Sequence, residues 1–283
     1  MRRSTTSAVT DRRSTAHARS RSRLAALLVA ELVFALLLIG RSEVPSGPMV
    51  ATPPTPASLT TPTAASRIHT LDDGRVVRLV NLGGPRSEEL LSRIGAEMDG
   101  AATAVTGFWG PRWPREVVIA AAGTEAQFAS LGGGDSGTAA TTTDERIMFA
   151  PAAADVSPAA LRIVLRHELF HYAARAETAA DAPRWLTEGV ADYVARPAAP
   201  KPDPATLALP TDAELAGPAR SLAYDRAWWF SRFVADRYGA ATLLELYRRA
   251  CGPGHPDVAT AVRDTLGTDL DAVLAGWRQW ASG

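Results

Sequence analysis

Cysteine and lysine are almost absent from this sequence of 283 residues, which contains one of each, Cys251 and Lys201. A single cysteine excludes an internal disulfide framework and any cysteine-rich zinc module. Cysteine usage therefore carries no information about the redox compartment of the protein. We attribute the preference for arginine over lysine, together with the abundance of alanine, to coding bias rather than to a chemical function.

A net charge is also absent, because 30 basic side chains balance 30 acidic ones. The two signs are nevertheless separated along the chain. Residues 1–23 hold seven arginines against one acid, whereas residues 41–283 hold 23 basic and 28 acidic residues. The folded part therefore lacks the basic excess that is typical of nucleic-acid binding, and no nucleic-acid partner is expected.

One long hydrophobic run, residues 24–40, follows the basic tail 1–23 and is interrupted only by Glu31. Its 17 residues would span about 25 Å as a helix, the short end of a membrane crossing. No A-x-A cleavage site directly follows Gly40, which favours an uncleaved anchor over a signal peptide. We therefore expect a single-pass protein of the cell membrane that contacts the lipid bilayer through residues 24–40. Its N-terminus would be cytoplasmic and its folded domain extracellular, and a secreted form is the alternative.

Residues 41–66 are rich in proline, threonine, serine and alanine, which is typical of an extended tether. We expect one folded domain over residues 67–283, in which residues 132–143 form a flexible loop. The residue patterns predict strands at 76–80, 116–120 and 146–150, and helices at 87–108, 157–176, 183–195, 219–238, 239–251, 256–266 and 269–282. Strands first and helices later predict an α+β fold, with a small N-terminal sheet and a mostly helical C-terminal half.

The most informative pattern is His-Glu-x-x-His at residues 167–171, within a helix that Ser157 and Pro158 are expected to begin. Histidines four residues apart lie on the same helix face, so His167 and His171 can bind one metal ion. Glu168 points away from that direction and can act on a water molecule at the metal. This is the pattern of zinc-dependent peptidases, which hydrolyse peptide bonds.

A catalytic zinc ion needs three protein ligands and one open position. The segment RWLTEGVADYVA (184–195) supplies Glu188 and Asp192, which share one face of a predicted helix. We expect Glu188 to be the third ligand. We expect Asp192 to accept a hydrogen bond from the second ring nitrogen of a metal-bound histidine, His167 in our interpretation.

A second arrangement, that of the metzincins, would place the third ligand at Glu177. The glycine that this arrangement needs is replaced by Ala174, and no methionine follows Met148 to form its methionine turn. The sequence therefore favours Glu188 over Glu177.

HELFH followed by WLTEGVADY resembles the gluzincin zinc metallopeptidases, and more closely the peptidase MA-like domains. The resemblance implies a zincin-like fold, Zn²⁺ as cofactor and a peptide or protein as substrate. It implies Glu188 as third zinc ligand and Glu168 as general base. Sixteen residues separate His171 from Glu188, fewer than in the best-known gluzincins. The competing function is a membrane-tethered binding module with a non-catalytic metal site.

Two further features belong to the resemblance. The strand RIMFA (146–150) would be an edge strand that lines the cleft and pairs with an extended substrate. Tyr224, on the helix AYDRAWWFSRFVADRYG, would donate a hydrogen bond to the oxyanion of the reaction. Packing in the core against Trp228 is the alternative for Tyr224, and the cluster Trp228, Trp229 and Phe230 is expected to be core.

Overall fold

The computed structural model describes residues 65–134 and 137–283. The predicted basic tail 1–23, the predicted anchor 24–40 and residues 41–64 of the predicted tether lie outside these ranges. Among the helices of the described part, none is both long enough and apolar enough to cross a bilayer. The first strand begins at Ala65, two residues before the predicted start of the domain.

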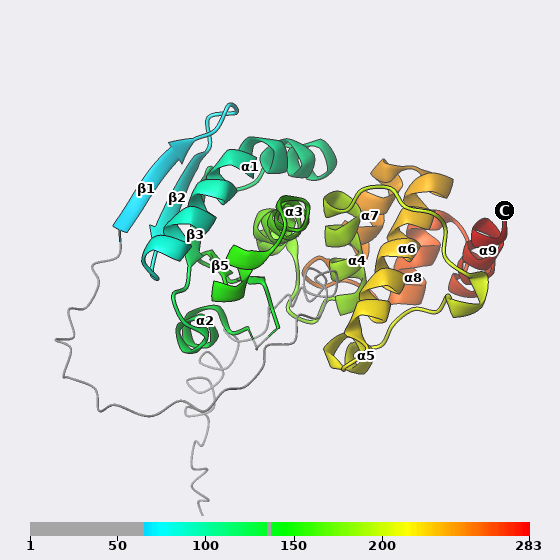
Figure 1. Cartoon of the computed structure of the whole chain (residues 1–283). Coiled ribbons are helices and arrows are strands. Elements are labelled where there is room, and N and C mark those ends of the chain that lie inside the picture. The colour runs from blue at the N-terminus through cyan, green and yellow to red at the C-terminus, as the bar shows by residue number, and fades with distance from the viewer. Residues whose placement is uncertain (1–64, 135–136) are drawn as a thin grey trace, which may run out of the picture.

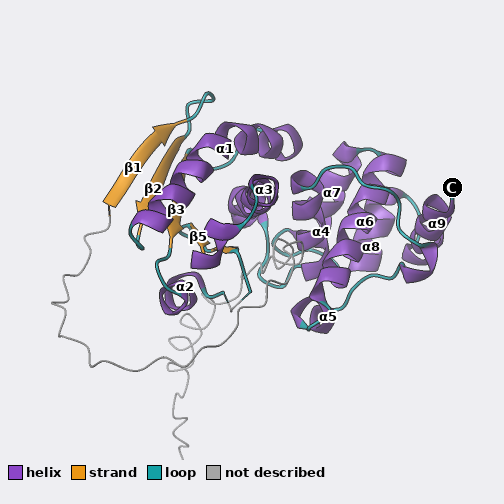
Figure 2. Cartoon of the chain, in the orientation of Figure 1, coloured by secondary structure: helices purple, strands orange, loops and turns teal. Residues whose placement is uncertain are grey.

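The fold is α+β, as predicted, with a sheet in the N-terminal half and helices throughout the C-terminal half (Figures 1 and 2). The sheet is mixed and has the strand order β1-β2-β3-β5-β4. The outer pairs β1/β2 and β4/β5 are antiparallel, and the inner pairs β2/β3 and β3/β5 are parallel. The strands are β1 (Ala65–Thr70), β2 (Val76–Asn81), β3 (Glu116–Ala121), β4 (Ala140–Thr142) and β5 (Ile147–Phe149).

Two helices lie between the strands in the chain and seven follow them within the described residues. The helices are α1 (Pro85–Trp109), α2 (Glu125–Gly132), α3 (Pro158–Ala174), α4 (Arg184–Ala195), α5 (Asp212–Ala216), α6 (Arg220–Tyr238), α7 (Ala240–Cys251), α8 (Val258–Leu266) and α9 (Leu270–Ser282). Each predicted helix agrees with the structure to within two residues at both ends. The patterns missed β1, β4, α2 and α5, which are short or poor in alternating hydrophobic residues.

The expectation that RIMFA forms an edge strand is wrong. Its core, Ile147–Phe149, is β5, which pairs with β3 on one side and with β4 on the other. The edge strand beside β5 is β4, which lies inside the segment 132–143 that was predicted to be a flexible loop. Its sequence, Ala-Thr-Thr, lacks the bulky apolar side chains that mark a strand, so its hydrogen bonds to β5 could not be foreseen.

The central strands β3 and β5 are covered on both faces, and the side chains that alternate between those faces are apolar on each. Ile119, Ile147 and Phe149 belong to the main core, which they share with α1 and α3. Met148, which points the other way, packs with Phe128 of α2 in a second, smaller cluster. Both faces of the central strands are therefore apolar, and α3 lies directly against the sheet.

Helix α3 lies between α1 and α4, and α4 lies between α3 and α6 (Figure 1). The Ser157 hydroxyl accepts a hydrogen bond from the amide of Ala160 at the start of α3, and Pro158 occupies the first helical position, as predicted. Because α3 touches the sheet on one side and α4 on the other, it joins the two halves of the fold.

At the end of α7, Cys251 is buried, and burial raises the pKa of its thiol.

Helices α4 and α6 approach most closely at Gly189. A Cβ atom on Gly189 would lie 2.4 Å from the carbonyl oxygen of Ala227 and 2.8 Å from Oγ of Ser231. The glycine therefore allows a backbone-to-backbone contact that no other residue permits without moving one helix. Since Glu188 precedes it directly, this contact also sets the position of the glutamate.

We expect Gly189→Ala to destabilise the fold by about 1–3 kcal/mol, because the added methyl group overpacks the contact between α4 and α6. Gly100→Ala is the matched control, since a Cβ at Gly100 of α1 meets no atom within 4 Å. There the substitution should stabilise the chain by about 0.5–1 kcal/mol through helix propensity. Chemical denaturation measures both changes, and equal effects of the two substitutions would contradict the close contact.

Candidate metal centre

Three ligand atoms from two helices converge between α3 and α4. Nε2 of His167 lies 3.0 Å from Nε2 of His171 and 3.2 Å from Oε2 of Glu188, and Nε2 of His171 lies 3.5 Å from the same Oε2. The two histidines come from α3 and the glutamate from α4. Together they form a group that could hold a metal ion.

The spacing of these atoms fits one face of a zinc tetrahedron. With bonds of about 2.0–2.1 Å, neighbouring ligand atoms of a tetrahedral zinc ion are about 3.3–3.4 Å apart. The three separations in this chain, 3.0, 3.2 and 3.5 Å, lie close to that value. Two imidazole nitrogens and a carboxylate oxygen are also a donor set that zinc accepts, with a fourth position left for water. The residues present therefore fit a catalytic zinc ion.

The exposure to solvent differs among the three ligand residues. His167 is fully buried and Glu188 is nearly so, whereas the side chain of His171 is 11 % exposed. Among the three ligand residues, His171 is therefore the one that solvent reaches most readily.

Asp192, one turn after Glu188 on α4, lies behind His167. Its Oδ1 accepts a hydrogen bond of 2.9 Å from Nδ1 of His167, which leaves Nε2 of that ring facing His171 and Glu188. Burial would lower the pKa of His167, but the hydrogen bonds and charges of Asp192 and Glu188 outweigh it and, without a bound metal ion, raise this pKa to about 10. A metal ion would take the place of the proton on Nε2. Burial alone would raise the pKa of Glu188, but His171 and His167 hold it well below its usual range.

Glu168 is fully buried beside the group, and only one of its carboxylate oxygens has a partner. Oε2 accepts a hydrogen bond of 2.7 Å from the hydroxyl of Thr142, on the edge strand β4. Oε1 is buried without a hydrogen-bond partner among the described residues. Burial raises the pKa of Glu168, although the nearby His167, His171 and Thr142 oppose the shift. A buried carboxylate oxygen with no partner is suited to accept a proton from a water molecule.

Tyr224 lies on α6 and is buried, with 3 % of its surface exposed. Burial, together with the charge of Glu188, raises the pKa of its hydroxyl well above the usual value, whereas the nearby Arg184 opposes the shift. The Tyr224 hydroxyl therefore lies within range of the Glu188 charge. The cluster Trp228, Trp229 and Phe230 is buried, as predicted.

Glu177, the third ligand of the metzincin alternative, lies apart from the group. Its side chain is 49 % exposed, and its carboxylate is 3.5 Å from the guanidinium of Arg248. The structure thus brings Glu188, rather than Glu177, to the two histidines.

Sequence patterns did not point to three residues that complete the surroundings of the group. Thr142 precedes the histidine pattern by 25 residues, and no periodicity links the two. Arg196 follows Asp192 at helical spacing, a signal that could have been used, and its side chain pairs with Oδ2 of Asp192 at 2.7 Å. Asp225, on α6, contacts Arg196 only through the folding of the chain.

Comparison with known proteins adds a partial likeness in structure. No protein-family model and no curated protein matches the sequence. A solved structure of a variant two-domain M1 zinc metallopeptidase bound to L-arginine is similar to 78 % of this chain, with a TM-score of 0.44 and 15 % identity. The chain spans about half of that protein, 52 % of its length. The chemistry of the site therefore rests on its own residues and distances.

Proposed function

We propose that this chain is a zinc-dependent peptidase of the gluzincin type with a zincin-like fold. The observation that carries the proposal is the triangle of Nε2 of His167, Nε2 of His171 and Oε2 of Glu188, whose sides match a zinc tetrahedron. The buried Glu168 carboxylate next to this triangle favours hydrolysis over simple metal storage, since a storage site needs no proton acceptor.

Zinc held by His167, His171 and Glu188 would activate a water molecule and polarise the scissile carbonyl group. Oε1 of Glu168 accepts the proton of the attacking water and passes it to the departing amine, while Thr142 holds Oε2 in place. Asp192 keeps the Nδ1 proton on His167, so that Nε2 stays available as a ligand.

Tyr224 completes the proposed chemistry from α6. Its hydroxyl donates a hydrogen bond to the oxyanion that forms when water adds to the carbonyl carbon. The burial of Tyr224 and the influence of the Glu188 charge on its hydroxyl support this role, because both indicate that the hydroxyl lies near the metal ligands.

The proposed substrate is a peptide or protein in an extended conformation. The edge strand β4 has β5 on one side only, and Thr142 at its end touches the general base. A substrate strand added to the outer side of β4 would therefore pass close to Glu168. For residues 24–40, the apolar composition and the preceding arginines support a role as a membrane anchor, with the peptidase domain outside the cell.

The purified full-length chain should bind about one zinc ion and hydrolyse members of a peptide library. A chelator should abolish hydrolysis, and added zinc should restore it. Elemental analysis and mass spectrometry of the peptide products measure the two properties. A chain that retains no zinc at neutral pH would refute the proposal, and a zinc-bound chain that cleaves no peptide would favour the binding module with a non-catalytic metal site.

A further inference from the structure

We propose that Arg196 is a positioning residue for the zinc site, and that it acts by fixing the carboxylate of Asp192 with the help of Asp225. The inference rests on the proposed function, because it assumes that His167 is a metal ligand. It adds two residues to the site, beyond those that contact the metal or the substrate.

A continuous series of contacts leads from the ligand His167 to Asp225. Oδ1 of Asp192 is 2.9 Å from Nδ1 of His167, and Oδ2 of the same carboxylate is 2.7 Å from Nη2 of Arg196. Nη1 of Arg196 then donates a hydrogen bond of 2.7 Å to Oδ1 of Asp225. Oδ1 of Asp192 is therefore held by a hydrogen bond to the imidazole, and Oδ2 by the charge of Arg196, in an ion pair that lacks hydrogen-bond geometry.

The surroundings of Arg196 keep this series rigid. Asp192 is fully buried, and only 4 % of the Arg196 side chain is exposed. The guanidinium lies over the ring of Trp228, with 5.0 Å between the guanidinium carbon and the ring centroid. Removing one partner of a buried ion pair leaves the other charge without compensation, which is far more costly than the loss of a surface pair. The position of Asp192 therefore depends on Arg196.

The planar guanidinium is suited to this task because two of its nitrogens address two different carboxylates. An ammonium group is a point charge without this fork, so lysine cannot hold Asp192 and Asp225 in the same way. Arg196 also directly follows α4, and its amide donates a hydrogen bond of 2.9 Å to the carbonyl oxygen of Asp192. Backbone and side chain thus place the guanidinium relative to the same aspartate.

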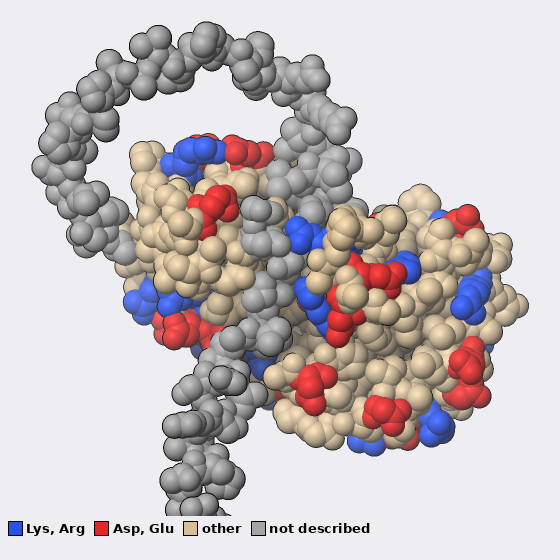
Figure 3. All heavy atoms as spheres, turned by 90° about the horizontal axis from the view of Figure 1, so that it is seen from below, with Lys and Arg blue, Asp and Glu red and all other residues tan. Residues whose placement is uncertain are grey.

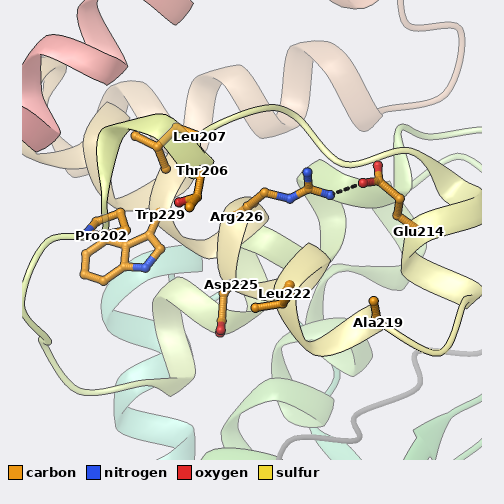
Figure 4. Close-up of a pocket in the computed structure, with 9 residues that line it drawn as sticks. All are labelled: Pro202, Thr206, Leu207, Glu214, Ala219, Leu222, Asp225, Arg226 and Trp229. Carbon is orange, nitrogen blue, oxygen red and sulfur yellow. Dashed lines mark hydrogen bonds and ion pairs between the residues drawn. The ribbon is translucent and has the colours of Figure 1, made fainter.

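The outer end of the series lies at a pocket of about 420 Å³ beside α6 (Figure 4). Asp225 contributes to the lining of this pocket and points away from the ion pair of Arg226 and Glu214 on its other side. The side chain of Asp225 is 31 % exposed. Its replacement therefore disturbs the core less than a change at Arg196, which makes it a useful second variant.

The alternative role for Arg196 is purely structural: its ion pairs would stabilise the packing of α4 against α6 without affecting the metal site. Measurement of zinc affinity in the full-length chain separates the two roles, because a tie between helices affects unfolding without affecting the bound metal. We expect Arg196→Gln to weaken zinc binding about tenfold, the low end of the range for groups behind metal ligands. Arg196→Lys should not restore the affinity, and Asp225→Asn should cause a smaller loss. The visible absorption of bound Co²⁺ should shift in Arg196→Gln.

Arg226→Gln is the matched control, since it removes an arginine–carboxylate pair between α6 and α5 that does not lead to His167. It should leave zinc affinity and the Co²⁺ spectrum unchanged. If Arg196→Gln does not fold, the zinc affinity of Asp225→Asn tests the inference instead. Affinity within twofold of wild type in the variants that fold, or full rescue by Arg196→Lys, overturns the inference. A wild-type chain without zinc overturns the proposed function and this inference with it, whereas a zinc-bound wild type with unaffected variants overturns this inference alone.

Discussion

Glu168→Gln should leave zinc binding intact and reduce peptide hydrolysis by at least about a hundredfold, because a positioned general base contributes about 10²–10⁴ to the rate. The glutamine side chain has the same shape as glutamate, and its amide oxygen can still accept the hydrogen bond from Thr142. The amide cannot, however, take a proton from water. Zinc content, thermal unfolding and the turnover number of one cleaved peptide are the measurements.

The fold should tolerate this substitution, since burial already disfavours the charged form of Glu168. Glu245→Gln makes the same chemical change on the exposed surface of α7 and should alter none of the three quantities. A Glu168→Gln chain that hydrolyses peptides at the wild-type rate would remove the carboxylate from the mechanism. Another group would then have to accept the proton.

Glu188→Ala should weaken zinc binding by more than about a hundredfold, since even a group behind a metal ligand contributes 10–100-fold. The variant leaves only the two nitrogens of α3, and the methyl group of the introduced alanine cannot replace the missing oxygen. Competition with a chromogenic chelator measures the affinity, and hydrolysis should be lost in parallel.

Glu177→Ala is the control for this prediction, because it removes a glutamate that is 49 % exposed and lies beside Arg248. Its zinc affinity should equal that of the wild type. If Glu177→Ala lost zinc while Glu188→Ala retained it, the metal would have to be bound differently from the arrangement of the three atoms described above.

The helical half of the fold was accessible from the sequence because its signals are local. Hydrophobic residues at helical spacing, with Ser157 before α3, mark where the helices begin and end. The same spacing predicted that His167 and His171 share a face, and that Glu188 and Asp192 share another. Local patterns suffice wherever the residues concerned lie within one or two turns of a helix.

The remainder required contacts between segments far apart in the chain. The order of β5 and β4 in the sheet depends on strand pairing. The short strand Ala-Thr-Thr has too few apolar residues for a sequence pattern to predict this pairing. Thr142 meets Glu168 only because β4 packs against α3, and Asp225 meets Arg196 only because α6 packs against α4. Gly189, which follows Glu188 on α4, allows the close contact with the backbone of α6. This role is visible only when the two helices are placed side by side.

The charged groups at the surface are arranged differently from those of the site. Figure 3 shows acidic and basic side chains lying among one another on the face in view. Pairs such as Arg86 with Asp155 and Arg249 with Asp264 are more than 40 % exposed, and each contributes little to stability. The pair of Asp192 and Arg196 is the contrasting case, because its charges are shielded from water and its geometry is fixed.

The buried thiol of Cys251 has a practical consequence for chemical labelling. The chain has no second cysteine with which to form an internal bridge, and this sulfur is neither accessible nor readily ionised. Dithiothreitol and mercaptoethanol therefore have no disulfide to reduce within the chain, and Cys251 is a poor target for alkylating reagents. A cysteine introduced at an exposed position, such as that of Glu177, would for the same reason be the single point at which a maleimide dye attaches.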